Sequence, residues 1–371
     1  MINFDIVNKL SIRELNEILK NPNFNLEDLK FPAYKNIYSF NYLRSAIDFL
    51  WKNINLKNKK VVFPAFTCPI VIEIALRNGI EPIIIDCDKD TFNLDFKEIE
   101  KLDFSNIDAI FVHHVFGNIL DIDKLRLLVK KNVIIVEDAA NCIDDNDYIG
   151  KGDYLLLSLY KYFPNFRGGL LLSNNIFQDS YELLMRDKID YKDKLSFLLH
   201  IEGLHQYFFN LLRSKRIPEE ENMNTLEWEI LKCDNLSLKF YLNQRLKAKK
   251  EIESRKLLRK YYLENLNPKY FYEQKVDLDH SYMNFSIVLK EDFNKFRDEI
   301  YKDLRKKNIF VDRMYFNAPL KEYAKYCHGE CKNAFYLASS IINLPIRSSY
   351  DEKDIKFLCE SVNNCLEILT A

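Results

Sequence analysis

The chain of 371 residues is long enough for about two to three domains. Its composition is 47% hydrophobic, with 27 Phe and 22 Tyr, which excludes intrinsic disorder for most of the chain. Lys and Arg total 54 against 55 for Asp and Glu, and this balance argues against a chain-wide basic surface that would bind nucleic acid.

The first half of the chain alternates helical patterns with short apolar runs. Residues 1–35 contain one helical pattern, at 12–19, and are predicted to form an N-terminal extension. Beyond them the predicted helices are 42–51, 70–77, 96–102 and 121–131, and the predicted strands are 60–63, 82–86, 108–113, 133–137, 154–158 and 169–173. Continuous apolar strands are typical of a sheet covered on both faces. The alternation therefore predicts an α/β fold, a three-layer αβα domain with a mainly parallel sheet over residues 36–235.

The second half of the chain is predicted to be mostly helical. A helical insert is expected over residues 176–230, including an amphipathic helix at 195–212 that packs on its own domain or on a partner subunit, with a position on a membrane surface as the alternative. A smaller C-terminal α+β domain is expected over residues 236–371. Its predicted elements are a long charged helix (242–263), a strand (284–289), a helix (291–306), a strand (308–312) and a last helix (351–369).

Membrane and metal sites are not expected from this sequence. The first nine residues are polar and carry both charges, so we expect no secretory signal, and no uninterrupted apolar run reaches the length of a transmembrane helix. The 8 cysteines are scattered, and we therefore expect reduced thiols in a cytoplasmic protein. The cluster Cys327-His328-Gly329-Glu330-Cys331 lacks a second ligand pair at a spacing typical of zinc, so we interpret it as a loop.

Chemically useful side chains follow the predicted strands. Ligands of open parallel sheets bind at the carboxyl ends of the strands, and these ends are followed here by Thr67 and Cys68, by His113 and His114, by Asp138, and by Ser158, Lys161 and Arg167. A pyridoxal phosphate site needs a lysine for the cofactor aldehyde, a carboxylate for the ring nitrogen, and hydroxyls with helix N-terminal N–H groups for the phosphate. We assign these three roles to Lys161, Asp138 and Ser45.

Several stretches of the chain match one known family. They are Arg44-Ser45-Ala46, Val62-Phe63-Pro64-Ala65-Phe66-Thr67-Cys68, Val112-His113-His114-Val115-Phe116-Gly117, Val136-Glu137-Asp138-Ala139-Ala140-Asn141, residues 158–169, and Ile342-Asn343-Leu344-Pro345. In these stretches the chain resembles the sugar aminotransferases of the DegT/StrS type, within the fold type I pyridoxal phosphate enzymes. The resemblance covers most of the chain but leaves residues 1–35 and about 175–230 unmatched.

The resemblance implies roles for individual residues. Lys161 would bind the cofactor covalently and move the proton between the cofactor and substrate carbons, and Asp138 would bind the ring nitrogen. The phosphate would be held by Ser45, by the backbone at Arg44 and Ala46, and by Ser158, although the spacing from Ser158 to Lys161 is three residues where five is common.

The chain also departs from the family pattern. Asn141 stands where a glutamine usually contacts the phenolic oxygen of the cofactor, and its side chain is one methylene shorter. Cys68 stands where many members place an aromatic over the ring, so Cys68, Phe66 or His113 is expected to cover the ring. Arg167 replaces a common acidic residue and is a candidate for an anionic substrate group, with a solvated loop charge as the alternative. Arg313 and Arg347 are candidates for the carboxylate of the amino donor, with salt-bridged surface arginines as the alternative.

We therefore expect a homodimeric aminotransferase with its site at the subunit interface. It would take an amino group from an amino acid, glutamate first, and give it to a keto sugar nucleotide. A small phosphorylated ketone is the alternative acceptor, suggested by Arg167. Two further hypotheses are another pyridoxal phosphate reaction (dehydration or decarboxylation) and a non-catalytic regulator that keeps the fold. The joint presence of Lys161, Asp138 and Ser45 argues against the regulator.

Overall fold

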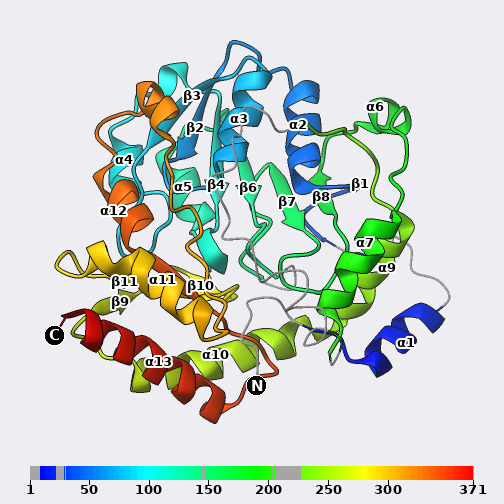
Figure 1. The fold of residues 1–371 in the computed structure, drawn as a ribbon. Helices are drawn as coiled ribbons and strands as arrows, with labels where there is room; N and C mark the ends of the chain where they lie inside the picture. Colours follow the sequence, from blue (N-terminus) through cyan, green and yellow to red (C-terminus); the bar gives the residue numbers. More distant parts are fainter. Residues whose placement is uncertain are drawn as a thin grey trace.

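A seven-stranded sheet forms the centre of the larger part of the molecule (Figure 1). The computed structural model describes residues 9–21, 29, 31–143, 147–202, 204 and 227–370. In spatial order the strands are β1 (Asn36–Phe40), β8 (Gly169–Ser173), β7 (Tyr154–Ser158), β6 (Ile134–Asp138), β4 (Ala109–His113), β2 (Lys60–Pro64) and β3 (Glu81–Ile85). The five strands from β7 to β3 are parallel, whereas β8 is antiparallel to both of its neighbours. The predicted mainly parallel sheet is confirmed.

Both faces of this sheet are buried, which makes three layers. Val61 and Phe63 of β2 belong to one apolar core, whereas Val62 between them belongs to a second core. Successive side chains of a strand point to opposite faces, so the two cores lie on opposite sides of the sheet. The first core includes residues of α2 (Leu43–Asn53) and α3 (Pro69–Arg77), and the second includes residues of α4 (Phe96–Glu100) and α5 (Ile122–Leu128).

A smaller unit with its own apolar core follows in the C-terminal third of the chain (Figure 1). Its antiparallel sheet has the order β12 (Ile341–Leu344), β11 (Phe285–Leu289) and β9 (Phe271–Glu273). Its helices are α10 (Ala248–Asn265), α11 (Arg297–Lys306), α12 (Lys332–Ser340) and α13 (Glu352–Thr370). A two-stranded ladder of β5 (Asn118–Ile119) and β10 (Asp279–His280) joins the segment after β4 to the start of this unit.

The remaining helices lie beside the β1 edge of the large sheet (Figure 1). They are α1 (Ile12–Lys20), α6 (Gln178–Glu182), α7 (Tyr191–Phe197) and α9 (Asn235–Gln244). Ile18, Phe197 and Phe240 form a small core that holds α1, α7 and α9 together. Short 3-10 helices occur at Phe104–Asn106, Val115–Gly117, Leu198–His200, Arg245–Lys247, Asn294–Phe296 and Lys321–Tyr326. Among the described helices, none is long and apolar enough to cross a membrane.

Strand β1 was not predicted from the sequence. Its five residues carry Asn36 and Ser39, so the segment has no clear run of strand-forming side chains. In the structure β1 pairs with β8, and the buried backbone of Ser39 is satisfied by Tyr181, whose hydroxyl donates to the Ser39 carbonyl at 2.9 Å. The pairing with β8 and the contact with Tyr181, 142 residues from Ser39, therefore stabilise this strand, and a local pattern cannot show either of them.

Three predicted elements in the second half differ from the structure. The expected helix at 242–263 is two helices, α9 and α10, separated by the tighter turn Arg245–Lys247, through which helical periodicity continues. The expected strand at 308–312 is wrong, because Asn308 has a positive φ and Asp312 forms only an isolated bridge with Asn343. Of the expected helix at 195–212, the structure describes only α7 and the 3-10 turn to His200, and residues 203 and 205–226 lie outside the described ranges.

We predict that Gly169→Ala destabilises the large sheet where β8 meets α2. A Cβ at Gly169 would lie 2.5 Å from the Leu43 Cα and 2.6 Å from the Leu43 nitrogen, which are backbone atoms that cannot rotate away. The expected loss of unfolding free energy is about 3 kcal/mol, measured by urea denaturation. Gly329→Ala is the control, since a Cβ there meets nothing within 4 Å and its positive φ should cost only about 1 kcal/mol. Equal losses in both variants would contradict the steric argument.

Candidate active site

A cavity of about 190 Å³ lies at the carboxyl ends of β4, β6 and β7. The chain runs from β2 outward to β3 and then returns to β4 on the other side of β2, so the strand order reverses at this place. Ligands of open α/β sheets bind at such a reversal. The residues that contribute polar atoms or rings to the cavity are Tyr42, Arg44, Cys68, His113, Asp138, Ser158, Tyr160, Lys161 and Tyr315.

Asp138 is a buried carboxylate at the end of β6. Its side chain lines the cavity, and its Oδ1 accepts one hydrogen bond, from the Ala140 N–H at 2.9 Å. Burial raises the pKa of Asp138 to about 6, although this N–H and the positive charge of Lys161 partly oppose the rise. The carboxylate is therefore only partly compensated, and a cationic group bound in the cavity would stabilise it further.

His113 lies beside Asp138, because β4 and β6 pair these two residues in register. Burial, followed by the positive charge of Lys161, lowers the pKa of His113 to about 3, so its imidazole is neutral near pH 7. Its Nε2 lies 3.0 Å from the Asn141 Oδ1 and its Nδ1 lies 3.1 Å from the Thr67 hydroxyl. The neutral ring is thus held at both nitrogens and presents a fixed surface to the cavity.

Lys161 enters the cavity from the segment after β7. It follows Ser158, the last residue of β7, by three positions and is half-buried. Ser158 and Arg44 line the same cavity, and among the described residues neither the buried Ser158 hydroxyl nor the buried Arg44 Nε has a hydrogen-bond partner. Two unsatisfied donors beside a lysine fit an anionic group such as a phosphate.

The first turn of α2 adds backbone donors to this corner. Tyr42 is the N-cap of α2 and, within the described structure, its side chain makes no capping hydrogen bond, so no side-chain cap occupies the first N–H groups of the helix. The N–H groups of Ser45 and Ala46 are instead used by the Tyr42 carbonyl, at 3.1 and 3.2 Å. The Ser45 hydroxyl donates to the Glu229 carbonyl at 3.2 Å. Phosphate contacts from Ser45 and Ala46 therefore stay predictions.

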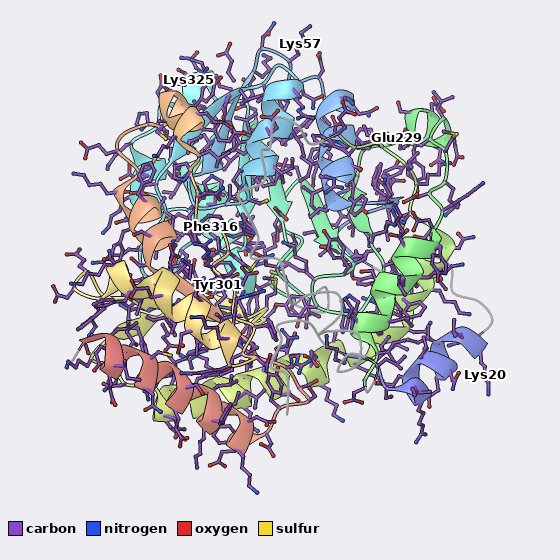
Figure 2. All side chains as sticks on the ribbon, in the orientation of Figure 1. Lys20, Lys57, Glu229, Tyr301, Phe316 and Lys325 are labelled. Carbon is purple, nitrogen blue, oxygen red and sulfur yellow. The ribbon has the colours of Figure 1, made fainter. Side chains whose placement is uncertain are left out.

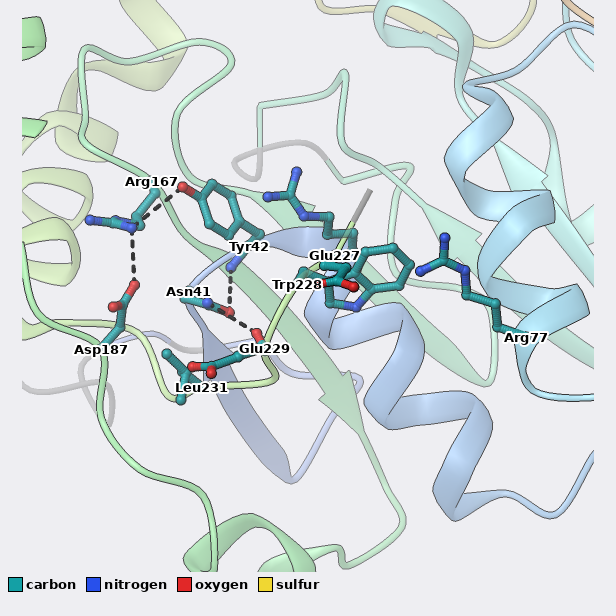
Figure 3. A pocket seen from close by; sticks show the side chains of 10 residues that line it. Asn41, Tyr42, Arg77, Arg167, Asp187, Glu227, Trp228, Glu229 and Leu231 are labelled. Carbon is teal, nitrogen blue, oxygen red and sulfur yellow. Dashed lines mark hydrogen bonds and ion pairs between the residues drawn. The ribbon is translucent and has the colours of Figure 1, made fainter. Parts of the chain in front are cut away.

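Arg167 lies outside this cavity and lines a larger neighbouring pocket of about 550 Å³ (Figure 3). Its guanidinium forms ion pairs with Asp187, at 3.3 Å, and with Asp193. It also donates to the Tyr42 hydroxyl at 3.4 Å. The two carboxylates compensate the charge of Arg167 within the chain. Tyr42 and Arg44 line both pockets, so the larger pocket adjoins the smaller one near the start of α2.

Arg313 and Arg347 are absent from the residues that line the cavity. Arg313 pairs with Asp298 at 2.7 Å and contacts the rings of Tyr301 and Phe316, both labelled in Figure 2. Arg347 is buried, with its guanidinium 4.4 Å from the centroid of the Tyr350 ring. The substrate role expected for these two arginines is untested and stays a prediction.

Sequence reasoning missed Tyr42 and Tyr315 as cavity residues. Tyr42 could have been found, because it directly precedes the predicted phosphate-binding helix. Tyr315 has no sequence signal: it comes from the smaller unit, where a tyrosine is one of 22 in an aromatic-rich chain. Of the two histidines, His113 lines the cavity, whereas His114 turns away and bonds the buried Glu137 carboxylate at 3.0 Å.

Comparison with known proteins connects this geometry to an established group. Residues 43–186 and 231–363 match the model of the DegT/DnrJ/EryC1/StrS aminotransferase family. Over 300 residues the chain is 25% identical to dTDP-4-amino-4,6-dideoxy-D-glucose transaminase of Shigella dysenteriae, which covers 77% of this chain and 74% of the relative. It is 24% identical over 356 residues to UDP-4-amino-4,6-dideoxy-N-acetyl-beta-L-altrosamine transaminase of Campylobacter jejuni, covering 91% and 87%.

A solved structure of another enzyme shares the fold. GDP-4-keto-6-deoxy-D-mannose-3-dehydratase of Escherichia coli, solved with bound hydrated PLP, superimposes with a TM-score of 0.68 at 17% identity. The superposition covers 89% of this chain and 88% of that chain. This agreement confirms the expected fold type I architecture. Because the neighbour is a dehydratase, the fold by itself does not select the reaction.

The raised pKa of Asp138 predicts a pH-dependent stability of the cofactor-free protein. The folded value of about 6 exceeds the unfolded value of about 3.9. The contribution of Asp138 to the free energy of unfolding is therefore fully present below about pH 4. This contribution, about 3 kcal/mol, is lost as the pH rises through about 6. Asp138→Asn keeps an oxygen for the Ala140 N–H and should abolish this loss. Urea denaturation from pH 4 to 8 measures both proteins, and identical pH dependences would contradict the prediction.

Proposed function

Because the chain belongs to the DegT/DnrJ/EryC1/StrS aminotransferase family, we propose that it transfers an amino group from an amino acid, glutamate first, to a keto sugar nucleotide. The meeting of Lys161, Asp138, Ser158 and Arg44 in one cavity carries this proposal. Both curated relatives described above are transaminases whose names specify dTDP- or UDP-linked amino sugars, which supports a nucleotide-linked acceptor.

The residues of the cavity fit pyridoxal phosphate, the cofactor of this enzyme class. When bound, the cofactor supplies an aldehyde carbon that receives the amino group and a ring that withdraws electrons. Asp138 would hold the ring nitrogen, whose proton compensates the buried carboxylate. The unpaired Arg44 Nε and Ser158 hydroxyl, with the start of α2, would hold the phosphate.

Three further side chains would act around the ring. Lys161 would bind the cofactor carbon and, once released by the donor, would carry a proton between the cofactor and substrate carbons. The neutral His113 and Cys68, which begins α3, line the cavity and are proposed to cover the ring. Asn141 has a buried Nδ2 that, within the described structure, lacks a partner, and this donor would serve the phenolic oxygen.

The acceptor is proposed to extend from this cavity into the larger neighbouring pocket. Arg167, Tyr42 and Trp228 line that pocket, so Arg167 stays a candidate for a substrate contact (Figure 3). A small phosphorylated ketone was the alternative acceptor suggested by Arg167. The structure supports it less well, because the carboxylates of Asp187 and Asp193 already compensate the charge of Arg167. Dehydration by the same lysine and aspartate is the second candidate reaction, favoured by the shared fold of the dehydratase.

The assembly and the domain limits belong to the same proposal. Large apolar side chains near α6 and α7 are exposed, namely Ile176, Leu183, Met185 and Tyr191. Apolar surface of this kind supports a homodimer with the site near the subunit interface. The proposed division is an extension (1–35), a cofactor-binding domain (36–235) and a small domain (236–371). Residues of α11 and α13 share an apolar core that supports the small domain, whereas Tyr315 and residues of α12 pack in the core of the large sheet. A cytoplasmic location is proposed with them, since none of the eight cysteines, all of which lie in the described part of the chain, forms a disulfide bond.

Lys161→Ala should abolish covalent attachment of the cofactor. After incubation with pyridoxal phosphate and reduction with borohydride, mass spectrometry should find the label on the peptide that contains Lys161. The variant should lose this label, and its amino-transfer rate should fall by about 10⁴-fold or more. Lys151→Ala is the matched control, because Lys151 forms a surface ion pair with Asp123 outside the cavity and its loss should leave the label in place. A wild-type protein without label would refute the proposal.

Glutamate should convert the loaded enzyme in a half-reaction that needs no acceptor. We expect one 2-oxoglutarate per active site, together with loss of the visible absorption band of the bound cofactor. Aspartate and alanine serve as comparison donors. With a 4-keto sugar nucleotide as acceptor, the product should contain the nitrogen of ¹⁵N-glutamate. A product that has lost a hydroxyl and contains no ¹⁵N would instead establish the dehydratase alternative.

A further inference from the structure

Asn141 is the centre of a buried hydrogen-bond cluster beside the cavity. Its Oδ1 lies 3.0 Å from the His113 Nε2, 3.2 Å from the Phe116 nitrogen and 3.2 Å from the Tyr315 hydroxyl. Its main-chain carbonyl accepts from the Tyr162 hydroxyl at 2.7 Å. Asn141 itself is fully buried. Three donors therefore converge on one amide oxygen in a place from which water is excluded.

This convergence determines which way the amide of Asn141 faces. The Phe116 backbone N–H can only donate, so the atom opposite it must be the oxygen and not the NH₂ group. His113 must then carry its proton on Nε2, and its Nδ1 accepts from the Thr67 hydroxyl. The Nδ2 of Asn141 has no acceptor anywhere in the described structure. A buried amide donor without an acceptor costs free energy. A ligand in the adjoining cavity, which is lined by His113, Ala140 and Tyr315 around Asn141, would supply the acceptor.

Tyr315 is the one member of the cluster that comes from the small domain. The backbone near it is fastened to β12, since Asp312 and Asn343 exchange two hydrogen bonds and the Met314 N–H donates to the Asn343 Oδ1 at 2.7 Å. From there the Tyr315 ring stacks on Phe116, with centroids 5.4 Å apart and planes 7° apart. Its hydroxyl thus reaches Asn141 from a different domain than the other two donors.

We propose that Tyr315 is a positioning residue for Asn141: its hydroxyl holds Oδ1 and thereby directs Nδ2 toward the ring oxygen of the cofactor. The inference rests on the proposed function, because the ring oxygen belongs to pyridoxal phosphate. The Tyr315 hydroxyl acts through Asn141 and need not touch the cofactor itself. Through this bond the arrangement of the small domain affects the electronic state of the cofactor in the large domain.

The test is the pH at which the visible absorbance of the bound cofactor changes. A hydrogen-bond donor to the ring oxygen stabilises the negative charge of that oxygen. The proton that the cofactor shares with Lys161 is then lost at a lower pH. Tyr315→Phe keeps the ring packing and loses the hydroxyl, and the midpoint should rise by about half to one pH unit. The other titratable or charged groups that line the cavity, Tyr42, Arg44, Cys68, His113, Asp138, Tyr160 and Lys161, are unchanged in this variant.

Two comparisons distinguish a positioning role of Tyr315 from direct contact with the cofactor and from a general loss of stability. Asn141→Ala should raise the midpoint at least as far, and adding Tyr315→Phe to it should produce no further rise, because the tyrosine would have nothing left to position. Tyr323→Phe is the matched control: Tyr323 is also buried, and its hydroxyl contacts Glu73 at 3.1 Å away from the cavity. It should leave the midpoint unchanged.

Two results would overturn the inference. One is a midpoint in Tyr315→Phe equal to that of the wild type, and the other is an additive rise in the double variant, which would mean that Tyr315 contacts the cofactor directly. Failure of the proposed function would be recognised separately, since the wild-type protein would then form no visible cofactor band. Thermal unfolding of each variant, measured in parallel, identifies a midpoint change that arises from a loosened fold.

Discussion

The buried carboxylate of Asp138 is the constraint on which the site depends. A single N–H from Ala140 and the nearby charge of Lys161 do not offset its burial, so its pKa rises to about 6. The adjacent His113 cannot compensate it, because burial keeps that imidazole neutral. The charge of Lys161 compensates the Asp138 carboxylate only in part, so a further cationic group bound in the cavity would stabilise it. A pyridine nitrogen that keeps its proton meets this need, and the carboxylate in turn keeps the ring electron-withdrawing.

The parallel sheet explains why these groups meet. β4 and β6 pair in register, so their last residues, His113 and Asp138, are neighbours, and β7 delivers Ser158 and then Lys161 to the same edge. The antiparallel β8 turns the chain back after the lysine and lies against the start of α2. That contact places the start of α2 and Arg44 beside the cavity. Tyr315, from the segment between α11 and α12, also lines it.

Much of this arrangement could be predicted from the sequence. The rest could not, because it depends on contacts between residues that lie far apart in the chain. Strands β7 and β8 have the predicted limits, and Lys161 and Asp138 were found because a parallel sheet gathers whatever follows its strands. β1 was not predicted, because it is stabilised by pairing with β8, which lies far away in the sequence. The Ser45 hydroxyl, predicted to hold the phosphate, donates to the Glu229 carbonyl. Arg167, a candidate for an anionic substrate group, forms ion pairs with two carboxylates of the chain. Local pattern gives no information about such distant partners.

The sequence by itself predicted most of the strands and helices of the large sheet, apart from β1, and the residues that follow each strand, because periodicity and burial are local properties of the chain. It therefore determined the class of chemistry. Only the tertiary structure decided which donors lack a partner among the described residues, namely the Arg44 Nε, the Ser158 hydroxyl and the Asn141 Nδ2. It also decided that the Tyr315 hydroxyl reaches the Asn141 Oδ1. The reason is that hydrogen-bond satisfaction depends on three-dimensional neighbours, which may be 174 residues apart in the chain.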